Sequence, residues 1–144
     1  MAVLTYNKAI TWIANSEVNL GNTTANAFYV MLLNSAPFTA ANTHVGNIQG
    51  YWSTNVGNMA LVNVALDDTS SAGNTVWKAD DITFTATGIC NTNAFVVFAN
   101  TTETQAVRKL ICYNSLGSFV NMAANDTLTI YTNAGLIRID DLGT

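Results

Sequence analysis

The sequence carries little charge, and this scarcity excludes a first group of functions. Charged residues make up only 10% of the chain, the formal net charge is −4 at pH 7, and the pI is near 4.5. Arg108 and Lys109 are the only adjacent basic residues. Five scattered cations cannot build the basic face that binds nucleic-acid phosphates or an anionic membrane surface. We therefore expect neither nucleic acid nor membrane among the partners.

Long hydrophobic runs are also missing. No stretch approaches the roughly 18 uninterrupted apolar residues of a membrane-spanning helix. The first 21 residues have neither the basic start nor the continuous apolar core of a signal peptide. We therefore expect folding in a cytoplasm, where Cys90 and Cys112 stay reduced and act as small buried hydrophobes. A disulfide between them is the alternative.

Groups that could perform catalysis are scarce. His44 is the only histidine, and a Ser-His-Asp triad or a His/Cys zinc site would depend on it. Phosphate-binding loops and the HExxH and GxSxG motifs are absent. Aspartate pairs occur at 67–68, 80–81 and 140–141, but neighbours on a strand point to opposite faces, so turn or edge roles are favoured over calcium or acid–base sites. The prediction is a protein with no catalytic residue, metal or cofactor, and with His44 on an exposed loop.

Asparagine and threonine take the place of charge, and together they form roughly a quarter of the chain. Threonine favours strands and asparagine favours turns, so the composition indicates a β-rich fold with tight connections. Hydrophobic residues make up 49%, and little charge repulsion opposes association. We interpret this surface as one that is covered in the working state. A soluble monomer with an Asn/Thr surface is the alternative.

Short strand-like runs separated by turn residues fill most of the chain. Residues 26–33 and 93–100 are almost continuously apolar, which is typical of buried strands. Further strands are expected at 59–66, 75–78, 82–87, 106–113, 126–132 and 136–139, with turns at 67–74 and 133–135. Residues 34–57 lack periodicity, and residues 114–125 are expected to form a loop.

One short helix is expected at residues 5–14, with Thr5 as its N-cap. Its apolar face is formed by Tyr6, Ala9, Ile10 and Ile13, with Trp12 beside it. Because so short a helix is unstable alone, it must pack on the end of a sheet or on a partner. The whole pattern predicts one all-β domain over residues 1–144, an antiparallel β-sandwich or jelly roll of about eight strands with this helix in front.

Several segments resemble a known family when they are taken in order. They are YNK at 6–8, AFYVMLLNS at 27–35, Thr43-His44, ADDITFTA at 79–86 and FVVF at 95–98. This order, over roughly residues 5–139, resembles small structural proteins of tailed-phage virions. The resemblance implies a β-sandwich subunit of a homo-oligomer that decorates or cements the capsid, or that serves the head–tail junction or tail.

The leading hypothesis is therefore a non-catalytic capsid cement protein, assembled in the host bacterial cytoplasm and located in the virion. It would bind the outer shell as a homo-oligomer, for which a trimer is one arrangement, and bridge neighbouring major capsid subunits. The alternatives are a tail, neck or fibre-adaptor protein, a carbohydrate-binding module that uses its tryptophans and tyrosines, and an enzyme that joins His44 to carboxylates. The candidate contact residues are Tyr6, Trp12, Pro37, Phe38, His44, Tyr51, Trp52, Phe119, Val120 and Met122. Each could instead belong to the core.

Overall fold

A computed structural model describes residues 2–67, 76–100, 103–132 and 137–138 of the chain. Its strands are β1 (Ala2–Thr5), β2 (Phe28–Leu33), β3 (Met59–Ala60), β4 (Ala65–Asp67), β5 (Val76–Lys78), β6 (Ile82–Thr85), β7 (Cys90–Ala99), β8 (Leu110–Met122), β9 (Thr127–Ile130) and β10 (Ile137–Arg138). The helix α1 spans Asn7–Ala14, and 3-10 turns lie at η1 (Val45–Asn47), η2 (Gln49–Tyr51) and η3 (Gln105–Val107). Nearly all of the predicted turn at 67–74, the hairpin turn at 133–135 and the polar tail lie outside the described residues.

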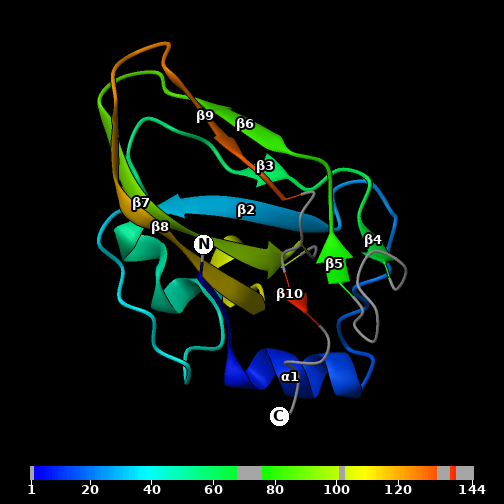
Figure 1. The fold of residues 1–144 in the computed structure, drawn as a ribbon. Coiled ribbons are helices and arrows are strands. Elements are labelled where there is room, and N and C mark those ends of the chain that lie inside the picture. Colours follow the sequence, from blue (N-terminus) through cyan, green and yellow to red (C-terminus); the bar gives the residue numbers. More distant parts are fainter. Residues whose placement is uncertain (1, 68–75, 101–102, 133–136, 139–144) are drawn as a thin grey trace.

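Within the described residues all strand pairs are antiparallel, and they form three sheets. The largest has the order β1-β8-β7-β2-β3, the second β10-β5-β4, and the third pairs β6 with β9. In Figure 1, β6 and β9 lie above the five-stranded sheet and α1 lies below it. The predicted all-β, sandwich-like fold with one short helix is therefore confirmed.

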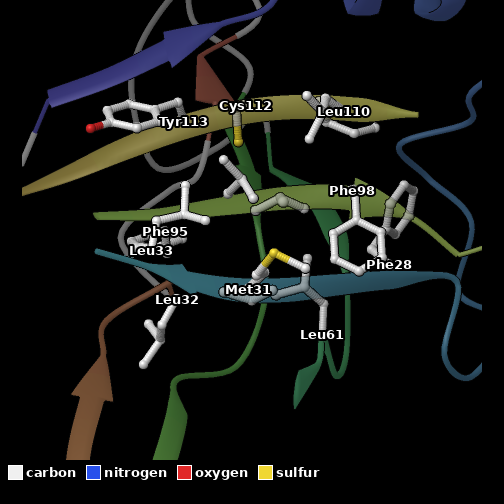
Figure 2. Packing of buried hydrophobic residues seen from close by; sticks show 14 of the residues in the cluster. Phe28, Met31, Leu32, Leu33, Leu61, Phe95, Phe98, Leu110, Cys112 and Tyr113 are labelled. Atoms are coloured by element: carbon white, nitrogen blue, oxygen red, sulfur yellow. The ribbon is translucent and has the colours of Figure 1, made fainter. Parts of the chain in front are cut away.

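The central strands β2 and β7 are buried on both faces, which explains their continuous apolar sequences. On one face, Phe28 packs edge-on against Trp77, with ring centroids 5.0 Å apart. Elsewhere on the sheet, the ring of Tyr113 on β8 lies 5.6 Å from that of Phe38 in the 34–44 segment. Figure 2 shows side chains of β2, β7 and β8 filling the space around these strands.

The N-terminal segment differs from the prediction in one respect. Residues 2–5 form an edge strand that pairs with Cys112–Ser115, so Thr5 ends β1 and is not the N-cap of α1. The N-cap is Tyr6, in extended conformation and without a side-chain capping bond. Ala9 and Trp12 are buried, whereas Ile10 and Ile13 are half-buried, so the buried face is turned toward Trp12. The helix packs against β8 of its own chain.

The predicted loop at 114–125 is wrong, because β8 continues through it to Met122. Ala94 pairs with Ser115 and Thr92 pairs with Val120, so residues 116–119 bulge out of the ladder opposite Asn93. Gly117 has a φ of +82°, a conformation that glycine adopts without strain. Residues that are typical of loops therefore form a bulge within β8, and the side chain of Phe119 in this bulge is exposed.

Two other predicted strands have different bounds. The run at 59–66 is divided into β3 and β4, and Asn63 between them has a φ of 52°. The strand expected to begin at 106 begins at Leu110, because residues 105–107 form η3. Residues 34–57 are irregular apart from η1, η2 and two isolated bridges, Leu33–Trp52 and His44–Lys109.

Replacing Tyr6 with phenylalanine is expected to leave the free energy of unfolding unchanged or to raise it by about 1 kcal/mol. The Tyr6 ring is fully buried, and within the described parts of the chain its hydroxyl has no hydrogen-bond partner. Phenylalanine keeps the ring and removes a buried polar atom that is not satisfied. Urea unfolding of the two proteins measures the difference, and a loss of more than about 1 kcal/mol would show that the hydroxyl is hydrogen-bonded.

Candidate functional site

His44 lies at the edge of the core and is half-buried, not on an exposed loop as the sequence suggested. Its ring meets the buried Trp12 edge-on, with centroids 5.5 Å apart. Its Nδ1 atom lies 2.7 Å from the hydroxyl of Thr43, and its backbone bridges that of Lys109. These contacts attach the segment before η1 to α1 and to Lys109, the residue before β8, so the histidine has a packing role.

Trp12 also holds charged side chains at this edge. The Lys109 ammonium lies 5.5 Å from the centroid of the Trp12 ring and 3.8 Å from a carboxylate oxygen of Glu17. Both charged side chains are partly exposed, so the ion pair contributes little to stability. Among the residues that the structure describes, no three His, Cys, Asp or Glu side chains gather to hold a metal ion.

The aspartates of the described region make local structural contacts. A carboxylate oxygen of Asp67 lies 2.7 Å from the Lys78 ammonium, across the β4–β5 pair. An oxygen of Asp80 accepts a 2.7 Å hydrogen bond from the Asn63 side chain. These contacts suit turn and edge roles, while Asp68, Asp140 and Asp141 lie outside the described residues.

Cys90 and Cys112 are both free and buried. Burial raises the pKa of the Cys112 thiol to about 12, only partly offset by a hydrogen bond from the Asn114 side chain. At neutral pH this cysteine is therefore a protonated, enclosed thiol and a poor nucleophile.

Raising the pH above about 9 is expected to destabilise the fold. An unfolded Cys112 loses its proton near its ordinary pKa of 9.0, whereas the folded chain holds it to about 12. The unfolded state then binds fewer protons, so the contribution of Cys112 to the free energy of unfolding is constant below pH 9 and falls by about 1.4 kcal/mol per pH unit from pH 9 to 12. Burial also raises the pKa of Tyr6, which adds to the loss at higher pH.

Urea unfolding of the wild-type chain and of Cys112→Ala between pH 7 and pH 10.5 measures this dependence. The variant should lose less stability over the alkaline range, although it starts from a lower value at pH 7. An equal alkaline loss in both proteins would contradict the assignment to Cys112.

Several candidate contact residues prove to be internal. Tyr6, Trp12 and Met122 have exposed fractions of 0%, 4% and 4%, so in the folded chain they present almost no surface to a partner. Trp12 lies on the buried face of α1, which packs against β8, and Met122 pairs with Cys90 within the five-stranded sheet. Phe38 is half-buried beside Tyr6, with ring centroids 5.2 Å apart, and Pro37 is exposed.

The side chains of Tyr51 and Trp52 have exposed fractions of 42% and 38%. The sequence had left open whether this pair belongs to the core or to the surface. The backbone beside them is firmly held, because the Asn34 N–H donates to the Tyr51 carbonyl at 2.8 Å and the Ser53 N–H donates to the Leu32 carbonyl at 2.9 Å. This arrangement presents two large aromatic side chains from a fixed position at the end of β2. We call this pair the 51–52 aromatic surface.

A second apolar surface lies between β8 and β9. Phe119 is 55% exposed and Val120 half-buried on the bulged part of β8, and Tyr131 at the end of β9 is 68% exposed. An open cleft of about 330 Å³ lies beside them, lined by Leu116, Val120, Leu128, Thr129, Ile130 and Tyr131. We call this surface the β8–β9 cleft.

The sequence prediction missed Tyr131 as a surface residue, although a signal was present. Ile130 points into the core, and the alternation of a strand places the next residue outward. Ile89, 73% exposed in the turn before β7, was also missed, and no pattern in the sequence indicates its exposure.

Comparison with known proteins assigns neither a family nor a function to this chain. No protein-family model, no curated protein sequence and no solved structure matches this chain. In the described part of the chain, no helix has the length and apolar character needed to cross a membrane.

Proposed function

We propose that this chain is a non-catalytic structural subunit of a tailed-phage virion, and specifically a cement protein on the outer shell. It binds as a homo-oligomer and bridges neighbouring major capsid subunits. The observation that supports this proposal best is the set of large apolar side chains left in water on a chain with so little charge. Four of them are Tyr51 and Trp52 on the 51–52 aromatic surface, Tyr131 in the β8–β9 cleft and Phe119 next to Val120 of that cleft.

The 51–52 aromatic surface has the properties of an anchor. Tyrosine and tryptophan bury much area at a low entropic cost, and they dominate the binding energy of many interfaces. Here the backbone bonds to Leu32 and Asn34 reduce that cost further, because the position of the pair is set before binding. A shell protein repeats such a contact in every copy, and the repeated contacts hold the particle together.

The stability of the particle tests the cement role. Virions of the source phage would be prepared with and without the coding sequence of this chain and then heated, while a DNA-binding dye reports genome release. Particles without the chain should release DNA at a lower temperature, and adding the purified chain should restore the original temperature. Adding Trp52→Ala at the same concentration should restore it less. Release at the same temperature with and without the chain would overturn the proposal.

A further inference from the structure

The β8–β9 cleft leaves the sandwich open on one side. Leu116, Val120 and Leu128 line the cleft and also pack against the core, so the cleft is continuous with the protein interior. Tyr131 forms part of its wall and is mostly exposed. A free chain would keep this apolar surface in contact with water, at a cost that grows with its area.

The two strands that line this opening, β8 and β9, each have an edge that is unpaired in the described part of the chain. β9 pairs with β6 from Thr127–Thr85 to Ile130–Ile82, and no strand of the described chain pairs along the other edge of β9. Neighbouring residues of an antiparallel strand direct their N–H and C=O groups to opposite edges, so about half of those of β9 face the open side. β1 pairs with β8 only as far as Ser115. Beyond Ser115, the edge of β8 that faces β1 has no strand partner in the described region. An unpaired edge beside an apolar cleft is suited to receive another strand.

The charge around the opening favours a copy of the same chain as the occupant. The six residues that line the cleft are aliphatic apart from Thr129 and Tyr131, and none is charged at neutral pH. In a two-fold contact each patch meets its own copy, so a charged patch repels itself and an uncharged patch does not. Two other exposed apolar side chains lie close to charge: Leu66 beside Asp67, and Val62, whose carbonyl accepts from the Asp80 N–H. With a net charge of −4, two copies approach most easily through an uncharged surface.

We propose that a second copy of this chain docks on the β8–β9 cleft by antiparallel pairing of β9 with β9. A two-fold axis at Thr129 places Leu128 of one copy opposite Ile130 of the other, so the apolar side chains stay on one face of a continuous β6-β9-β9-β6 sheet. The pairing places Tyr131 of one copy opposite Thr127 of the other and sets the second copy against the open side of each sandwich. The proposal rests on the homo-oligomer of the proposed function and names its contact surface. It gives a dimer, in place of the trimer considered from the sequence.

Light scattering coupled to gel filtration tests this pairing on the full chain over a range of concentrations. The wild type should have the mass of a dimer. Tyr131→Lys should raise the dimer dissociation constant at least tenfold, because it puts a charge in place of an apolar ring at each end of the paired strands, and the contact would have to desolvate that charge. Val62→Lys is the matched control, since Val62 is 55% exposed and does not line the cleft; its mass should equal that of the wild type. Thermal unfolding of each variant checks that it is folded.

Hydrogen exchange gives a second readout that is specific to the strand edge. The outward-facing amides of β9 should exchange more slowly as the concentration of the wild type rises, and this protection should be lost in Tyr131→Lys. A wild-type monomer at every concentration, or a trimer whose mass Tyr131→Lys does not change, would overturn the pairing. Particle stability is measured independently of the oligomeric state. If chain-free particles release DNA early but Tyr131→Lys has the same oligomeric state as the wild type, this contact surface is rejected and the cement role is not.

Discussion

Replacing Trp77 with alanine is expected to lower the free energy of unfolding by about 3–5 kcal/mol, which is a large part of the stability of a domain of this size. The Trp77 side chain has an exposed fraction of 0% and packs edge-on against Phe28. Its indole N–H donates a 2.7 Å hydrogen bond to the Leu20 carbonyl. Alanine would leave a cavity between β5 and β2 and an unpaired carbonyl.

Urea unfolding of the purified variants measures this effect. Trp77→Phe separates its two causes, because it keeps most of the ring volume and loses the hydrogen bond, so its loss should be intermediate. A loss below about 1.5 kcal/mol for Trp77→Ala would show that Trp77 does not support the core as the structure indicates.

The Trp52→Ala variant is expected to have the opposite profile. Trp52 is exposed at the end of β2, so its removal should change the free energy of unfolding by less than about 1 kcal/mol. As the anchor of the proposed capsid contact it should contribute about 2 kcal/mol or more to binding, so the affinity for the particle should fall roughly 30-fold. The measurement is binding of labelled chain to chain-free particles, followed by sedimentation.

The Trp77 and Trp52 variants serve as controls for each other. Trp77→Ala should weaken binding only as far as it unfolds the chain, whereas Trp52→Ala should weaken the binding of a folded protein. Trp52→Phe should keep part of the affinity. If Trp52→Ala instead lowered the melting temperature and left particle occupancy unchanged, Trp52 would belong to the core and the anchor role would be wrong.

The buried strands could be predicted from the sequence because burial on both faces leaves a local mark. β2 and β7 are nearly continuous apolar runs, and β6 alternates between buried and exposed residues as its sequence does. The short helix was also visible, since a run of helical spacing stands out among strands. These patterns depend on neighbours within a few residues.

The elements that were missed depend on distant partners. β1 has only four residues and is a strand because β8 offers it an edge more than 100 residues away. The end of β8 contains Gly117, Asn121 and other residues typical of loops, yet Val120–Met122 pair with the start of β7. Such pairing comes from the tertiary fold and has no local pattern.

The candidate contact surface was predicted only in part for the same reason. Aromatic residues beside an irregular segment can face inward or outward, and the sequence left Tyr51 and Trp52 open between the two. Packing decides the outcome: Trp12 is covered by His44 and Lys109, while Trp52 stays at the surface. The β8–β9 cleft could not be predicted from the sequence, because it forms only where the bulge of β8 and the end of β9 come together in the folded chain.

We propose that this chain works by being packed into a virus particle. Quantitative mass spectrometry of purified virions, which gives the number of copies of this chain per particle, tests it most directly. The cement role predicts on the order of hundreds of copies, as many contacts share the load. A few dozen copies or fewer would indicate a tail or neck part instead. Virions that lack the chain altogether, with the purified protein a monomer that turns over a substrate through His44, would contradict the account.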